Sequence, residues 1–147
     1  MIGLIVTGHG HFASGLTEAL NVIAGPADHY YAVDFNLCDS TDLLAEKLEQ
    51  AMDNLAADCE SVLVLSDLAG GSPFKLSVEL GYPRGYEVVA GTNLGMLVEI
   101  NMVRQFMDDV HMLAKQAVTV GKDQVQAFEF KQPVAMDEDE EDFSDGI

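Results

Sequence analysis

The hydrophobic residues of this chain follow two patterns, which alternate along the sequence. Two short and almost continuous apolar runs are IGLIVT (2–7) and SVLVLS (61–66). Runs of this kind are typical of strands that are buried on both faces of a parallel sheet. The segments YYAVDF (30–35) and YEVVA (86–90) predict two further strands.

Each predicted strand is followed by apolar residues at helical spacing. Ser40-Thr41 and Ser72-Pro73 are start signals, because serine caps a helix and proline fits its first position. Five helices are predicted. The first covers residues 13–24, the second has its apolar face at residues 44–55, and the third begins at residues 72–73. The fourth has its apolar positions at residues 96–103, and the fifth covers residues 108–120 and ends at Gly121.

This alternation predicts an α/β fold of three layers, with helices on both faces of a mostly parallel β-sheet. The segment VQAFEF (125–130) alternates in hydropathy, which favours an edge strand or a strand exchanged between subunits. In such folds ligands bind beyond the carboxyl ends of the strands, where the strand order reverses. The loops after the first, third and fourth strands therefore form the candidate site.

Length and composition fit one domain. The chain has 147 residues, of which 48% are apolar, enough for one core. We expect the domain to span residues 1–132 and an acidic, flexible tail to cover 133–147, since acids crowd residues 137–145. Cys38 and Cys59 form no metal or redox motif and are interpreted as reduced thiols.

The formal net charge is −18. A field of this sign repels phosphate backbones and anionic lipid, which argues against nucleic acid or a membrane surface as partner. A protein with a basic surface is a better candidate for the partner. No basic residue precedes Lys47 and no apolar run is long enough to cross a membrane, so we expect a cytoplasmic protein.

The loop after the first strand carries His9 between Gly8 and Gly10. The glycines allow a sharp turn and the close approach of a large partner. An imidazole at this place can act as a nucleophile, a base or a metal ligand, or can simply be held by loop carbonyls. His11 is interpreted as a bystander.

The loop after the third strand carries Asp67 and then Gly70, Gly71 and Ser72. A carboxylate can hold one ring proton of a nearby histidine and leave the other nitrogen free to attack, or it can cap its own loop. The glycines and the serine offer N–H groups, a hydroxyl and a helix N-terminus to an anion. Histidine, carboxylate and anion-binding loop together favour a reversible phosphohistidine relay.

Three stretches resemble the IIA component of the mannose-class sugar phosphotransferase system in order and spacing. They are IGLIVTGHGHFASGL, VLVLSDLAGGSPF and YEVVAGTNLGMLVE, and the resemblance covers residues 1 to about 130. It implies that His9 is phosphorylated, that Asp67 orients and polarises it, and that Ser72 contacts the phosphoryl group. The glycines of the implied phosphoryl-binding loop are Gly10, Gly70 and Gly71.

The resemblance also implies a route for the phosphoryl group, without cofactor or metal. The histidine phosphocarrier protein donates it, a IIB component on a separate polypeptide accepts it, and a sugar entering through the membrane subunits IIC and IID receives it. A homodimer is implied in which each subunit lends its last strand to the other. Phe12, Leu68 and Leu94 are candidates for an apolar docking rim. The phrase TGHGHFASG and the terminal Gly-Ile favour N-acetylgalactosamine or galactosamine as the sugar.

Two other classes of function are also compatible with the sequence. His9, His11 and Asp67 could be the ligands of a metal-dependent hydrolase, because two histidines and a carboxylate suit zinc. A regulatory module, or a phosphocarrier of the dihydroxyacetone-kinase type, would share the histidine chemistry without serving a sugar transporter.

Overall fold

The structure is a computed structural model of the chain, and residues 1–130 are described. The predicted acidic tail, residues 133–147, lies outside the described residues. No helix within residues 1–130 has the length and apolar character that crossing a membrane requires.

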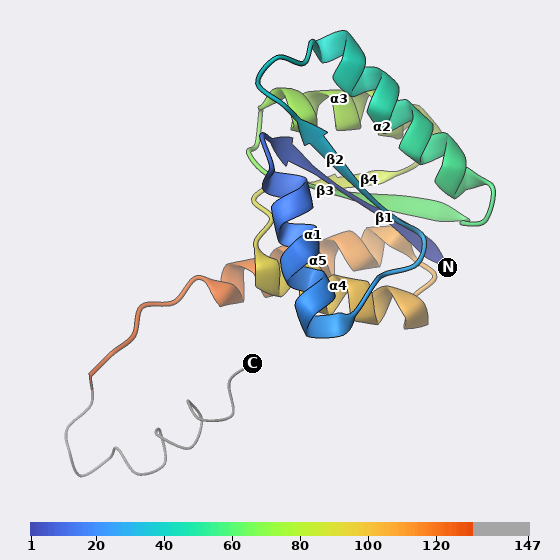
Figure 1. Cartoon of the computed structure of the whole chain (residues 1–147). Coiled ribbons are helices and arrows are strands. Elements are labelled where there is room, and N and C mark those ends of the chain that lie inside the picture. The colour runs from blue at the N-terminus through green and yellow to red at the C-terminus, as the bar shows by residue number, and fades with distance from the viewer. Residues whose placement is uncertain (131–147) are drawn as a thin grey trace.

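Four parallel strands form the sheet, as Figure 1 shows. The strand order is β2-β1-β3-β4, so β1 and β3 occupy the centre. The bounds of the strands are β1 Ile2–His9, β2 Tyr30–Phe35, β3 Ser61–Ser66 and β4 Glu87–Val89. The two continuous apolar runs of the sequence are thus the two central strands, as predicted.

Helices cover both faces of the sheet. One face carries α1 (Phe12–Ala24), α4 (Leu94–Val103) and α5 (Val110–Gln124), and the other carries α2 (Thr41–Ala56) and α3 (Ser72–Gly81) (Figure 1). Two short 3₁₀ turns, Tyr82–Arg84 and Arg104–Phe106, follow α3 and α4. The predicted three-layer α/β fold is confirmed.

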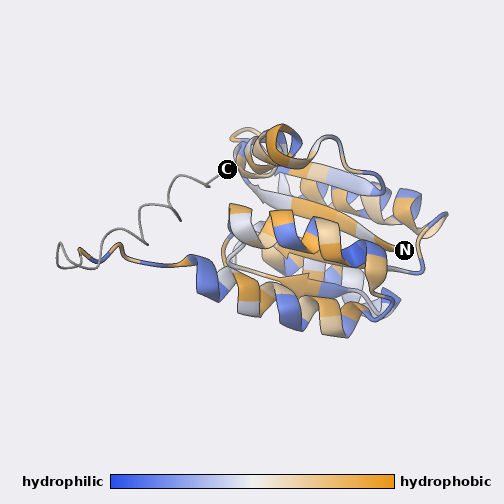
Figure 2. Ribbon diagram, turned by 90° about the horizontal axis from the view of Figure 1, so that it is seen from below, coloured by the Kyte–Doolittle hydropathy of each residue, from blue (hydrophilic) through white to orange (hydrophobic). Residues whose placement is uncertain are grey.

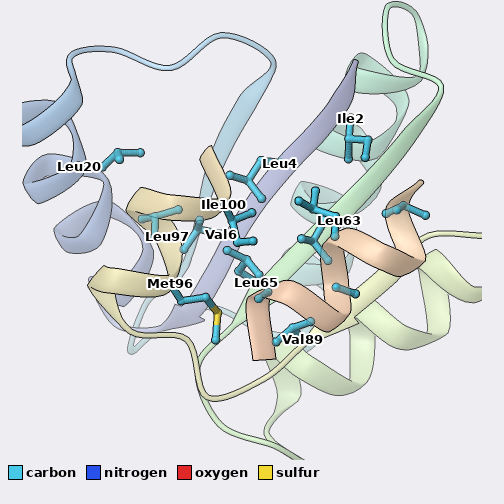
Figure 3. Packing of buried hydrophobic residues seen from close by; sticks show 14 of the residues in the cluster. Ile2, Leu4, Val6, Leu20, Leu63, Leu65, Val89, Met96, Leu97 and Ile100 are labelled. Carbon is cyan, nitrogen blue, oxygen red and sulfur yellow. The ribbon is translucent and has the colours of Figure 1, made fainter. Parts of the chain in front are cut away.

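The central strands are apolar throughout because both of their faces are covered. Leu4 of β1 and Leu63 of β3 point to the side of α1, α4 and α5, where Leu97 and Ile100 pack against them (Figure 3). Alternate residues such as Ile5 belong to a second core beneath α2 and α3. In Figure 2 the hydrophobic colour follows the strands, whereas polar and apolar residues alternate along the flanking helices.

The last helix differs from the prediction, because Gly121 does not end it. Helix α5 begins after Asp109, whose side chain accepts hydrogen bonds from two backbone N–H groups, and continues to Gln124. Gly121 is buried inside the helix, where an added Cβ would lie 2.4 Å from the end of Met96. This glycine allows α4 and α5 to approach closely and is not a stop signal.

The segment Val125–Phe130 forms no edge strand within the single chain. It has no regular secondary structure, and its apolar residues Val125 and Phe130 are exposed. The exchange of this segment between two subunits stays a prediction.

Candidate functional site

The sheet brings His9 and Asp67 together at the point where the strand order reverses. His9 is the last residue of β1, and Asp67 directly follows the neighbouring strand β3. From β1 the chain crosses to β2 on one side, whereas β3 and β4 lie on the other side. Parallel α/β folds bind their ligands at such a switch point, at the carboxyl edge of the sheet, which is where the sequence predicted the site.

One oxygen of Asp67 binds His9 twice. Oδ2 accepts a hydrogen bond from the His9 backbone N–H at 2.8 Å and lies 2.7 Å from Nδ1 of the ring. The carboxylate side chain is only 9% exposed, whereas the imidazole is 48% exposed. With its proton on Nδ1, the ring presents a lone pair on Nε2 to the solvent.

Burial and hydrogen bonding act in opposite directions on Asp67. Burial works to raise the pKa of the carboxyl, but the His9 backbone and ring, with the Leu68 backbone N–H, stabilise the ionised form. The hydrogen bonds prevail, so the pKa of Asp67 lies below its ordinary value. At neutral pH the group is a carboxylate, which can accept the hydrogen bond of a proton on Nδ1 of the ring.

Gly71 allows the His9 ring to occupy its place. An added Cβ at this position would lie 2.9 Å from Cε1 of His9 and 3.7 Å from Nε2. Gly70 and Gly10 have positive φ angles of 83° and 57°, which glycine adopts without strain. Gly70 turns the loop so that the Gly71 N–H donates to Leu68 O at 3.2 Å.

Ser72 is the first residue of α3, and not its cap as predicted. Gly71 is the N-cap residue, and Pro73 occupies the second helical position. The Ser72 hydroxyl, half-buried, makes no hydrogen bond within residues 1–130. A free hydroxyl at a helix N-terminus, one residue after the glycine that contacts the His9 ring, is suited to bind an anion attached to Nε2.

The rim of the site is partly apolar. Leu68 is 64% exposed, whereas Phe12 and Leu94 are half-buried, so of the three expected rim residues Leu68 is the most accessible. Leu37 is 99% exposed and was missed by the sequence analysis. It follows β2 in the loop after Phe35, whose ring centre lies 5.8 Å from that of His9. The position of this leucine in a polar turn between a predicted strand and a predicted helix is the sequence signal that could have identified it.

The structure does not bring His9, His11 and Asp67 together as a metal site. Within residues 1–130, no group of three or more histidine, cysteine, aspartate or glutamate side chains has the proximity that a metal ion needs. His11 precedes α1 at an exposed position, and Nδ1 of His9 is engaged by Asp67. The hydrolase hypothesis therefore lacks its ligand set in this part of the chain.

Comparison with known proteins agrees with this geometry. Residues 3–118 match the family model EIIA-man, described as "PTS system fructose IIA component". The chain is 32% identical over 108 residues to the fructose-specific EIIA component of Bacillus subtilis, and the match covers 73% of each chain. It is 30% identical over 131 residues to the mannose-specific EIIAB component of Escherichia coli, covering 88% of this chain and 40% of that longer protein.

Solved structures show the same fold. A phosphotransferase system component EIIA from Streptococcus agalactiae has a TM-score of 0.77 and 29% identity, with 87% of this chain and 98% of that chain covered. A mannose/sorbose-specific IIA subunit from Enterococcus faecalis gives 0.78 and 26%, with 89% and 97% covered. The chain belongs to the EIIA-man family of phosphotransferase-system IIA components, which transfer phosphoryl groups via histidine in a relay with the histidine phosphocarrier protein and a IIB component.

Proposed function

We propose that this IIA component carries its phosphoryl group on Nε2 of His9. The observation that supports this assignment is the double contact of Asp67 Oδ2 with His9, which engages Nδ1 and leaves Nε2 accessible. The lone pair of Nε2 attacks the phosphorus of the donor phosphohistidine. The N–P bond of the donor breaks as the new one forms, and its electron pair returns to the donor ring.

Asp67 and Ser72 act on different parts of this transfer. As Nε2 is phosphorylated, the His9 ring gains positive charge, and the carboxylate of Asp67 stabilises it through the proton that stays on Nδ1. The Ser72 hydroxyl and the N–H group of Gly70 bind the oxygens of the phosphoryl group, whereas the Gly71 N–H is engaged by Leu68 O. Catalysis consists mostly of positioning and electrostatic stabilisation, because phosphoryl transfer requires little further covalent chemistry from the protein.

Partner proteins dock on the rim around His9. Leu37 and Leu68 project from the loops after β2 and β3 and offer apolar contacts. The net charge of −18 attracts a basic protein surface over a distance and thereby accelerates association. The histidine phosphocarrier protein and IIB would use this rim in turn, and IIB would pass the phosphoryl group to a sugar that enters through the membrane subunits.

A homodimer with exchanged C-terminal segments is part of the proposal. Among residues 1–130, the edge strand β4 (Glu87–Val89) pairs with β3 on one side and with no strand on the other, while the segment Val125–Phe130 follows α5 without regular secondary structure. A second chain could place this segment on β4. Light scattering of the full chain, compared with a chain shortened at Gln124, measures whether the dimer depends on it.

The sugar is proposed to be N-acetylgalactosamine or galactosamine. This assignment rests on the sequence TGHGHFASG and on the terminal Gly-Ile. Similar proteins are named for fructose, sorbose and mannose, so the sugar varies within the family. The test is growth on each sugar after deletion of the gene for this protein. Unimpaired growth on both amino sugars would contradict the assignment.

The site assignment is tested by phosphorylation in vitro. The protein is mixed with phosphoenolpyruvate, the first enzyme of the system and the phosphocarrier protein, and its intact mass is measured. We expect one acid-labile phosphoryl group per chain, complete loss of it in His9→Ala, and retention in the matched variant His11→Ala. A phosphoryl group that persists in His9→Ala would contradict the assignment. A wild-type protein that accepts none from active partners would refute the relay and favour the regulatory alternative.

A further inference from the structure

Three buried side-chain oxygens among residues 1–130 have no hydrogen-bond partner, and all three lie at the same edge of the sheet. They are Oγ1 of Thr7, Oδ1 of Asp67 and Oγ1 of Thr92. Thr7 and Thr92 are 0% and 7% exposed. Because buried polar atoms are nearly always hydrogen-bonded in folded proteins, three such atoms near one catalytic pair require an explanation.

Backbone pairing places both threonines beside the segment that carries Asp67. Thr7 of β1 lies in register with Ser66, the residue before Asp67. On the other side, the Thr92 N–H donates to Ser66 O at 3.1 Å, and the Gly91 N–H donates to Asp67 O at 2.6 Å. The backbone of Thr7, in β1, and that of Thr92, in the loop after β4, therefore lie on opposite sides of the end of β3.

The three atoms are chemically complementary. A threonine hydroxyl can donate, whereas the oxygen of an ionised carboxylate only accepts. The Leu68 N–H also stabilises the ionised Asp67 carboxylate, yet Oδ1 makes no hydrogen bond of ordinary length and angle within residues 1–130. The Ser66 hydroxyl already donates to Val89 O at 3.3 Å. Donors for Oδ1 are therefore to be found in the two threonines, connected through a water molecule, which typically joins two to four buried polar groups.

We propose that Thr7 and Thr92 are positioning residues for phosphoryl transfer, and that their hydroxyls hold Oδ1 of Asp67 through an internal water. This inference rests on the proposed role of His9. Oδ2 alone contacts His9, so the orientation of the carboxylate depends on what holds its other oxygen. A fixed Oδ1 prevents the carboxylate from turning, and thereby keeps the proton of His9 on Nδ1.

The test compares valine and serine at the two positions. Valine has the shape of threonine without the hydroxyl, and serine restores the hydroxyl. The first readout is the fraction of His9 with its proton on Nδ1, measured by ¹⁵N nuclear magnetic resonance of the unphosphorylated protein. The second readout is the transfer from the phosphocarrier protein. In Thr7→Val and Thr92→Val we expect a smaller Nδ1–H fraction and a kcat lower by about tenfold with an unchanged KM, and Thr7→Ser and Thr92→Ser restore both.

Thr17→Val is the matched control. Thr17 is half-buried, and its hydroxyl bonds Ala13 O at 2.7 Å and the Tyr30 hydroxyl at 2.6 Å, away from the site. This variant is expected to change stability and to leave the His9 tautomer unaltered. Valine variants of Thr7 and Thr92 that lower stability but keep both the wild-type tautomer and kcat would overturn the inference. The tautomer is measured without phosphorylation, so a failure of the proposed function itself would be recognised separately, by a phosphoryl group found elsewhere than on His9.

Discussion

The two edges of the sheet differ in how completely their charged side chains are hydrogen-bonded. At the amino edge, Arg104 is only 2% exposed, and the guanidinium donates to the backbone oxygens of Ile2 and His29 at 3.0 Å each, and also to Asp28 O. The side chain of Asn101 adds an acceptor at 3.0 Å from Nη2. At the carboxyl edge, the half-exposed ring of His9 meets a carboxylate with one oxygen unpartnered.

This difference in hydrogen bonding assigns a structural role to Arg104 and a chemical role to His9. Arg104 has acceptors on all three nitrogens and ties the starts of β1 and β2 to α4, although its burial lowers the pKa of the guanidinium. His9 has one ring nitrogen engaged and one accessible. A satisfied charge holds the fold, whereas a partly satisfied one is available for chemistry.

The largest expected effect comes from Asp67→Asn. The amide keeps the shape of the carboxylate but loses the negative charge that stabilises the phosphorylated ring, and its NH2 group can face Nδ1 in place of an acceptor and so select the other tautomer. We expect phosphoryl transfer to fall by roughly 100- to 10,000-fold, while unfolding in urea changes little in comparison. The measurement is the rate of transfer from the phosphocarrier protein. Asp53→Asn, which affects a carboxylate bound to Arg84 at the surface, is the control, and an equal loss in both variants would contradict the role of Asp67.

Arg104→Ala is expected to give the next largest effect, and on stability only. Without the guanidinium, the backbone oxygens of Ile2 and His29 lose a buried donor. Each unsatisfied buried group costs about 1–3 kcal/mol, so the free energy of unfolding should fall by about 3 kcal/mol. Urea denaturation measures this loss. The protein that remains folded should accept a phosphoryl group at the wild-type rate, and a selective loss of transfer would break the separation between the two edges.

Gly71→Ala is expected to lower transfer without a comparable loss of stability. A methyl group at this position would lie 2.9 Å from Cε1 of His9, so the ring must move away from it. A displaced nucleophile reacts more slowly, and we expect a decrease of roughly tenfold in kcat. Gly15→Ala is the matched control, because an added Cβ meets nothing within 4 Å in α1. Equal kinetics of the two variants would show that the close approach at Gly71 has no function.

The smallest expected effect concerns pH. The pKa of Asp67 is lower in the folded chain than its ordinary value of 3.8, so ionised Asp67 contributes stability above that pH and loses it as the pH falls through the folded value. The stability difference between the wild type and Asp67→Asn should therefore shrink from about pH 5 to about pH 2. Thermal unfolding across this range measures it. A difference that grows with acid would contradict the direction of the shift.

Local sequence patterns predicted most of the fold and the main residues of the site. Continuous apolar runs identify β1 and β3 as central strands, since only a strand covered on both faces needs no polar positions. The parallel arrangement then brings the residues that follow these strands to one edge, which explains why the pairing of His9 with Asp67 was foreseen.

Long-range contacts explain what the sequence did not predict. Gly121 is a residue type that typically ends a helix, yet its close approach to Met96 gives it a packing role inside α5. Arg104 finds its backbone acceptors 75 to 102 residues away along the chain, and no periodic pattern encodes such contacts. Thr92 lies in the loop after the fourth strand, which belongs to the candidate site, but its burial and its missing hydrogen-bond partner arise from its contact with the end of β3.

The most direct test of the account is the position of the phosphoryl group on the histidine ring. The protein is phosphorylated with ¹⁵N-labelled histidine, and nuclear magnetic resonance distinguishes the two ring nitrogens of the phosphorylated residue. Because Asp67 engages Nδ1, we predict phosphorus on Nε2 of His9, with a proton on Nδ1. Phosphorus on Nδ1 of His9, or on any other residue, would contradict the central claim.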